Sequence, residues 1–175
     1  MQAHALILGG ARSGKTRLGL ARTEALSARR LYIATAEAWD DEMAARIARH
    51  TAERGDGWAT LEEPLALAEA LASDAARGAD AVLVDCLTLW LSNLMHHEKD
   101  VEAETEALIE ALRACPRPVS LVSNEVGLGL VPETPLGRAF RDEQGRLNQR
   151  LAAALPQVAF VAAGLPLALK GPPLA

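Results

Sequence analysis

Cysteine and aromatic side chains are scarce in this sequence of 175 residues. The two cysteines, Cys86 and Cys115, form no CxxC spacing. We therefore expect neither a disulfide framework nor a cysteine zinc site, and a reducing compartment such as the cytoplasm suits the chain best. Three Trp, one Tyr and two Phe stand in a chain that is 50% hydrophobic. The core should therefore consist mainly of Leu, Ala, Val and Ile.

Long hydrophobic runs and an excess of positive charge are also lacking. No stretch approaches the roughly 20 apolar residues of a membrane-spanning helix. The first apolar run is short and passes straight into Gly9 and Gly10, so we expect no signal peptide. The net charge is −5, which argues against a general nucleic-acid or anionic-membrane surface. With no repeat and no low-complexity linker, residues 1–175 should form a single domain.

Short apolar runs alternate with longer stretches of helical periodicity along the chain. Runs that are apolar throughout are typical of strands buried on both faces, so the pattern predicts an α/β fold with a mostly parallel sheet. The predicted strands are 3–8, 31–34, 81–84, 119–122 and 158–162, with an edge strand at 165–169, and the predicted helices are 15–28, 40–53, 64–76, 87–95, 101–114 and 136–154.

Residues 9–16, GGARSGKT, match the P-loop pattern between a predicted strand and a predicted helix. In this pattern backbone N–H groups surround phosphate oxygens, and the helix N-terminus adds positive potential. Lys15 would carry charge to the β- and γ-phosphates, and the hydroxyl of Thr16 would bind Mg²⁺. The alternative is a glycine-rich turn without a ligand. The predicted phosphate-binding residues are Gly9, Gly10, Ala11, Arg12, Ser13, Gly14, Lys15 and Thr16.

Other polar residues follow the later strands. Asp85 ends the run VLVD, where P-loop proteins place a second acid for the metal. The alternative is an N-cap of the next helix, a common role for aspartate. Asn124 and Glu125 end the fourth predicted strand and could face a substrate, or they could cap the loop before Gly127.

His50 is the candidate whose role the pattern leaves open. On the predicted helix 40–53 it shares a face with Met43 and Ile47. A lone histidine beside an apolar face is commonly a packed residue, although imidazole is also a versatile catalyst. The Asn-Lys-x-Asp sequence that reads guanine in GTPases is missing.

The chain resembles the bifunctional adenosylcobinamide kinase/adenosylcobinamide-phosphate guanylyltransferase family of cobalamin biosynthesis, a P-loop NTPase of RecA-like fold. The resemblance runs almost from end to end, and its last block is the most specific. The blocks that carry it are GGARSGKT (9–16), YIATAEAWDDEMAARIARH (32–50), WATLEEPL (58–65), VDCLTLWLSNL (84–94) and NEVGLGLVPETPLGRAFRDEQGRLNQRLA (124–152).

The resemblance implies two reactions, a role for His50 and a homotrimer. The first reaction phosphorylates adenosylcobinamide with ATP or GTP, and the second transfers GMP from GTP to the product through a guanylylated histidine, here His50. Mg²⁺ would be held by Thr16 and Asp85. The segment Ala34, Thr35 and Ala36 and the segment Thr51, Ala52, Glu53 and Arg54 would contact nucleotide. Glu62 would do the same, unless it only supplies charge to the first turn of a helix.

Two other functions also fit the residues. The chain could be a plain small-molecule kinase in which His50 is structural. It could also be a regulatory nucleotide-binding module without transfer chemistry. A covalent GMP adduct would separate the first interpretation from both.

Overall fold

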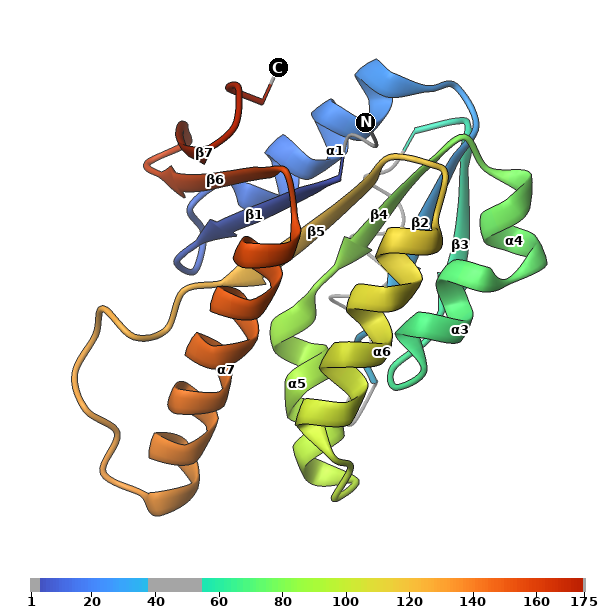
Figure 1. Ribbon diagram of the computed structural model, residues 1–175. Helices are drawn as coiled ribbons and strands as arrows, with labels where there is room; N and C mark the ends of the chain where they lie inside the picture. Colours follow the sequence, from blue (N-terminus) through green and yellow to red (C-terminus); the bar gives the residue numbers. More distant parts are fainter. Residues whose placement is uncertain (1–3, 38–54, 175) are drawn as a thin grey trace.

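The computed structural model describes residues 4–37 and 55–174, and within them a seven-stranded sheet forms the centre of the molecule (Figure 1). The strand order is β3-β2-β4-β5-β1-β6-β7. All pairs are parallel except β6 with β7. This confirms the predicted mostly parallel α/β sheet and its antiparallel edge strand. The strands are β1 Ala5–Gly9, β2 Arg30–Ala34, β3 Trp58–Glu62, β4 Ala81–Asp85, β5 Val119–Asn124, β6 Gln157–Ala162 and β7 Leu165–Lys170.

Helices cover both faces of the sheet, with α1 on one face and α5, α6 and α7 on the other (Figure 1). The central strands accordingly send alternate side chains to cores on the two faces. Ile7 lies in a cluster with Leu18 of α1, whereas Leu6 lies in the larger cluster that includes α3, α5, α6 and α7. The helices are α1 Lys15–Leu26, α3 Leu67–Ala72, α4 Asp74–Gly78, α5 Leu87–His96, α6 Val101–Ala114 and α7 Pro135–Ala154.

Helix α1 packs closely on the central strands because Gly19 has no side chain. A Cβ at Gly19 would lie 2.9 Å from Leu83 Cδ1 and 3.1 Å from Val122 Cγ2. Separations this short are repulsive, so a larger residue would push α1 away from β4 and β5. The position of α1 matters because the helix begins at Lys15, directly after the predicted phosphate loop.

The structure differs from the prediction in two places. Strand β3 was not expected, because Trp58–Glu62 carries no apolar run and its residues are exposed or half-buried at the edge of the sheet. The predicted helix 64–76 is divided into α3 and α4, and the Ser73 side chain caps α4 by accepting a hydrogen bond from Ala76 N–H. The predicted helix 40–53 lies outside the described residues. Of the helices described, none is long and apolar enough to cross a membrane.

Candidate nucleotide-binding site

The loop between β1 and α1 has the shape of a phosphate cradle. Ser13 N–H donates to Gly10 O at 3.2 Å, and Arg12 and Gly14 have positive φ angles of 55° and 97°. Gly14 is the N-cap of α1 and offers no side-chain cap. The first N–H groups of a helix lack intrahelical partners, so here they are available to an anion in front of the loop.

Two glycines in the loop are fixed by close backbone contacts. A Cβ at Gly9 would lie 2.5 Å from Ser13 Oγ and 2.6 Å from Val161 O. Gly14 combines its positive φ with a Cβ position only 3.2 Å from the Cα of Gly164. Gly164, in the turn between β6 and β7, donates its N–H to Ser13 O at 2.8 Å. The turn therefore supports the loop from behind, a contact that the sequence did not predict.

Lys15 folds back over the loop that precedes it. Its Nζ lies 3.0 Å from Gly10 O, and the residue is 9% exposed. This places the ammonium group at the centre of the loop, where the P-loop pattern requires a cation. Thr16, the next residue of α1, is half-buried.

Asp85 ends β4, at the carboxyl ends of the parallel strands, where β1 also leads into the phosphate loop. A tyrosine holds one of its carboxylate oxygens. Tyr32 donates its hydroxyl to Asp85 Oδ2 at 3.1 Å. The N-cap of α5 is Cys86, which makes no side-chain cap hydrogen bond, so the capping role considered for Asp85 is wrong. Thr16 and Asp85 offer a hydroxyl and a carboxylate, which are the hard oxygen donors that suit a Mg²⁺ bound mainly by phosphates and water. The donor set therefore fits this metal.

Thr35 joins the ends of β2 and β4. Its hydroxyl donates to Cys86 O at 2.7 Å and accepts from Cys86 N–H at 2.8 Å, and the residue is fully buried. Asn93 of α5 donates to Thr35 O at 2.8 Å. The Thr35 side chain is thus engaged by the protein itself. Of its neighbours, Ala34 is the last residue of β2 and Ala36 is half-buried after the strand.

The Cys86 thiol is not a nucleophile in this structure. Burial, followed by the charge of Asp85, raises its pKa to about 11. The thiol is therefore protonated at neutral pH, and the reactive form of cysteine is the thiolate.

Glu62 also lies at the carboxyl ends of the strands, but far from the phosphate loop. It is the last residue of β3 and pairs with Ala34, which in turn pairs with Asp85. Four strand spacings separate β3 from β1, or roughly 19 Å. The idea that Glu62 supplies charge to a helix is wrong, because Glu62 ends a strand and the neighbouring Glu63 accepts from Leu65 N–H and Ala66 N–H before α3.

The two residues at the end of β5 have different roles. Glu125 caps the following loop, because its carboxylate accepts from Gly127 N–H at 2.7 Å and Leu128 N–H at 3.1 Å. Asn124 makes no such contact, and its backbone pairs with Gly9 at the start of the phosphate loop. His50 and the segment Thr51, Ala52, Glu53 and Arg54 lie outside the described residues.

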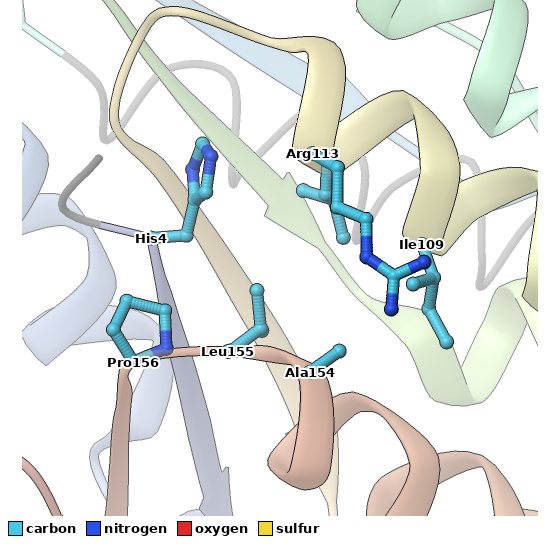
Figure 2. A pocket seen from close by; sticks show the side chains of 7 residues that line it. His4, Ile109, Arg113, Ala154, Leu155 and Pro156 are labelled. Carbon is cyan, nitrogen blue, oxygen red and sulfur yellow. The ribbon is translucent and has the colours of Figure 1, made fainter. Parts of the chain in front are cut away.

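A separate cavity of about 250 Å³ lies beside the start of β1, at the amino ends of the parallel strands and so away from the phosphate loop (Figure 2). His4, just before β1, and Arg113 of α6 line it. The Nδ1 atom of His4 accepts a hydrogen bond from Val119 N–H at 3.1 Å. Burial lowers the pKa of His4 although hydrogen bonds to the Leu112 and Cys115 backbone oppose this effect. His4 therefore braces the fold in its neutral form.

Comparison with known proteins places this geometry in a family. Residues 5–169 match the model of the family described as cobinamide kinase / cobinamide phosphate guanyltransferase. The bifunctional adenosylcobalamin biosynthesis protein CobP of Pseudomonas aeruginosa is 53% identical over 173 residues, which are 97% of this chain and 98% of that protein. CobU of Escherichia coli, named as a bifunctional adenosylcobalamin biosynthesis protein, is 42% identical over 183 aligned positions, covering 94% of this chain and 98% of its own.

Solved structures share the fold at low identity. The flagellar accessory protein FlaH of Methanocaldococcus jannaschii superposes with a TM-score of 0.56 at 12% identity, covering 97% of this chain and 78% of that chain. A KaiC-like protein of Pyrococcus horikoshii superposes with a TM-score of 0.52 at 12% identity, covering 90% and 70%. These neighbours confirm the predicted P-loop, RecA-like fold. The sequence matches go further, and the chain belongs to the cobinamide kinase / cobinamide phosphate guanyltransferase family.

Proposed function

We propose that this enzyme phosphorylates adenosylcobinamide with ATP or GTP and then transfers GMP from GTP to the product. One observation carries the proposal. Lys15 in its phosphate loop and Asp85 lie together at the carboxyl ends of the parallel strands. The chain that carries them is 53% identical to a bifunctional protein of adenosylcobalamin biosynthesis. The whole chain acts as one P-loop domain. The free, buried Cys86 and Cys115 are compatible with a reducing cytoplasm.

In the first reaction the phosphate loop holds the donor and the acceptor hydroxyl attacks. The hydroxyl oxygen of adenosylcobinamide forms a bond to the γ-phosphorus, and the bond from that phosphorus to the β–γ bridging oxygen breaks. The nucleoside diphosphate leaves, and the hydroxyl proton passes to solvent. Lys15 and the N–H groups before α1 stabilise the phosphate charge. Thr16 and Asp85 would hold Mg²⁺, which would supply positive charge to the phosphates.

In the second reaction His50 is the nucleophile. A neutral imidazole nitrogen attacks the α-phosphorus of GTP, the bond to the α–β bridging oxygen breaks, and pyrophosphate leaves. The phosphate of adenosylcobinamide phosphate then takes the GMP from His50, giving adenosylcobinamide-GDP. Dividing one difficult transfer into two lowers each barrier. In this proposal the guanine nucleotide contacts Ala34, Ala36, Thr51, Ala52, Glu53, Arg54 and Glu62. Thr35, which was also predicted to contact it, is fully buried and bonded to Cys86, so it holds this segment in place instead.

We also propose that the enzyme works as a homotrimer. Strand β7 is exposed along its whole length and carries three exposed leucines, Leu165, Leu167 and Leu169. The segment after β5 adds Leu128 and Leu130, which are 82% and 96% exposed. Exposed leucines in this number on a small protein are typical of a surface that a partner covers, and a second copy of the chain is the partner that the family resemblance implies.

The test of the proposed function uses GTP labelled at the α-phosphate, Mg²⁺ and the unmodified protein. We expect an acid-labile, base-stable label on the protein, because a P–N bond is labile in acid. Adding adenosylcobinamide phosphate should discharge the label into adenosylcobinamide-GDP. A protein that takes up no label but makes adenosylcobinamide phosphate would be a plain kinase, and one that does neither would be a binding module.

Replacement of Asp85 by asparagine should raise the Mg²⁺ concentration needed for half-maximal kinase activity by about tenfold, since a metal-bound carboxylate loses its charge but keeps its shape. The measurement is a Mg²⁺ titration at saturating nucleotide. Asp80→Asn is the matched control, because Asp80 stands just before the other end of β4 in an exposed ion pair with Arg29 at 2.7 Å. An unchanged titration for Asp85→Asn would remove Asp85 from the metal site.

A further inference from the structure

Asn93 is a buried amide that joins the ends of two strands. It lies on α5 and is 4% exposed. Its Nδ2 atom donates to Thr35 O at 2.8 Å and to Pro64 O at 3.1 Å. Thr35 follows directly after β2, and Pro64 stands two residues after the end of β3. A primary amide nitrogen carries two N–H donors, so this one side chain satisfies both backbone carbonyls.

The two carbonyls lie just beyond the point where the sheet stops joining these segments. The ladder between β2 and β3 ends at the pair Ala34 and Glu62, and Glu63 N–H donates to Ala34 O at 2.9 Å. Ladder hydrogen bonds fix the spacing of two strands only as far as the ladder runs. Past that point another element has to hold the two segments at a fixed spacing, and Asn93 does so from α5.

Helix α5 is a suitable frame for this bridge because it is firmly packed. Its side chains Leu87, Leu91 and Leu94 are fully buried in the larger core. Another leucine in place of Asn93 would avoid the cost of burying an amide. It would also remove the shared partner of the two carbonyls, and a buried carbonyl without a partner is costly. The two hydrogen bonds, and not packing, therefore account for an amide at this position.

The bridged segments carry residues that the proposed function assigns to the guanine nucleotide. Ala34 and Ala36 stand on either side of Thr35. Glu62 stands two residues before Pro64. A nucleotide that contacts both segments requires them at one spacing, because contacts displaced by about 1 Å lose much of their effect. The phosphate loop follows β1, four strand spacings from β3, so the bridge acts on the guanine end of the nucleotide.

We propose that Asn93 is a positioning residue for guanylyl transfer, which holds the segments after β2 and β3 at the spacing that GTP requires. The inference rests on the proposed function, in which GTP donates GMP. Asn93 touches no substrate, moves no proton and forms no bond to phosphorus. It acts through the residues on the two segments that it joins. Its loss should therefore weaken the use of GTP at low concentration more than the chemical step at saturation.

Two substitutions of Asn93 test the bridge. Asn93→Leu keeps a similar volume but removes both donors. Asn93→Ala leaves a space in which a water molecule could donate to the same two carbonyls, so it should fold well but lose the covalent tie to α5. With GTP labelled at the α-phosphate, both variants should need about tenfold more GTP for half-maximal labelling of the protein. The labelling rate at saturating GTP should fall by less than about threefold.

The kinase reaction with ATP should be spared. Its kcat/KM should change by less than about threefold in both Asn93 variants, because that reaction depends on the phosphate loop and not on guanine contacts. A merely structural role would move both reactions together, in proportion to the loss of folded protein. The split between the two reactions, measured beside a circular dichroism melt, therefore reports positioning.

Trp90→Phe is the matched control. Trp90 is also buried on α5, and its Nε1 donates to Leu65 O at 2.7 Å, one residue beyond Pro64. Phenylalanine removes this hydrogen bond but leaves both donors of Asn93 in place. The variant should melt at a lower temperature, as the loss of a buried hydrogen bond predicts. It should nevertheless need the same GTP concentration for half-maximal labelling as the unmodified protein.

Each outcome supports or overturns the inference. A raised GTP requirement in the Asn93 variants, with ATP-dependent kinase activity preserved and Trp90→Phe unchanged, supports it. If Asn93→Leu does not fold, Asn93→Ala alone decides. The inference is overturned if the folded variants need no more GTP than the unmodified protein, or if they lose both activities in proportion to stability. If the unmodified protein takes up no label from GTP, it is the proposed function that fails.

Discussion

Replacement of Lys15 by alanine should reduce both phosphoryl transfer and guanylyl transfer by about 10³-fold while leaving the protein folded. The Lys15 ammonium lies at the centre of the phosphate loop, 3.0 Å from Gly10 O, in a residue that is 9% exposed. With so little water around it, the charge of Lys15 is weakly screened. A neutral water molecule in the space left by the side chain could not replace that charge beside the phosphates. In the proposed function both reactions use a nucleoside triphosphate whose β- and γ-phosphates occupy the loop, so both should fail together.

The loss should not come from unfolding. Lys15 contributes a hydrogen bond to an oxygen, Gly10 O, that water can reach once the side chain is removed, and the packing of α1 depends on Gly19 and its neighbours. Both turnovers are measured beside a circular dichroism melt. Lys99→Ala, at an exposed residue between α5 and α6, is the matched control and should behave like the unmodified protein. Near-normal kinase turnover of Lys15→Ala would contradict the assigned role of the loop.

The centre of the fold could be predicted because its residues carry strong local signals. Val82 and Val84 face one core while Leu83 faces the other, so β4 is apolar without interruption and easily recognised as a buried parallel strand. The phosphate loop is equally explicit, since Gly9 and Gly14 are required by backbone contacts and Lys15 follows at a fixed spacing. Here the local pattern and the tertiary structure agree.

The edge strand β3 could not be predicted, because it is held by backbone pairing with β2 and not by burial of apolar side chains. Strand β3 is held by its parallel ladder with β2 and presents mixed, exposed residues, so its sequence has neither a continuous apolar run nor clear alternation. Without that strand, Glu62 was open to interpretation as a helix residue. The capping role belongs to Glu63 instead, one position further along the chain.

Contacts between distant residues were equally invisible in the sequence. The hydroxyl of Tyr32 reaches Asp85 from the neighbouring strand, and the turn at Gly164 supports Ser13 across about 150 residues of chain. Side-chain hydrogen bonds among Ser123, Gln144 and Asn148 likewise join β5 to α7. Such contacts depend on how separate elements pack against one another, which the local sequence pattern does not encode.

Replacement of His50 by alanine should abolish guanylyl transfer, by about 10⁴-fold or more, while kinase turnover falls by less than about tenfold. Phosphorylation in the proposed mechanism requires the phosphate loop, the metal and an oriented hydroxyl, but no covalent histidine. Guanylyl transfer in the proposed mechanism requires the imidazole itself, because GMP is attached to it between the two half-reactions. The variant should therefore accumulate adenosylcobinamide phosphate and stop there.

The label separates this mechanism from a packing role for His50. With GTP labelled at the α-phosphate, neither His50→Ala nor His50→Asn should become labelled, whereas His96→Ala, which removes an exposed histidine at the end of α5, should be labelled normally. A packed histidine would instead give a lower melting temperature and a proportionate loss of both activities, with asparagine milder than alanine. If His50→Ala still becomes labelled and completes the transfer, the GMP must pass through another residue. If it completes the transfer without a label, the phosphate of the substrate must attack GTP directly.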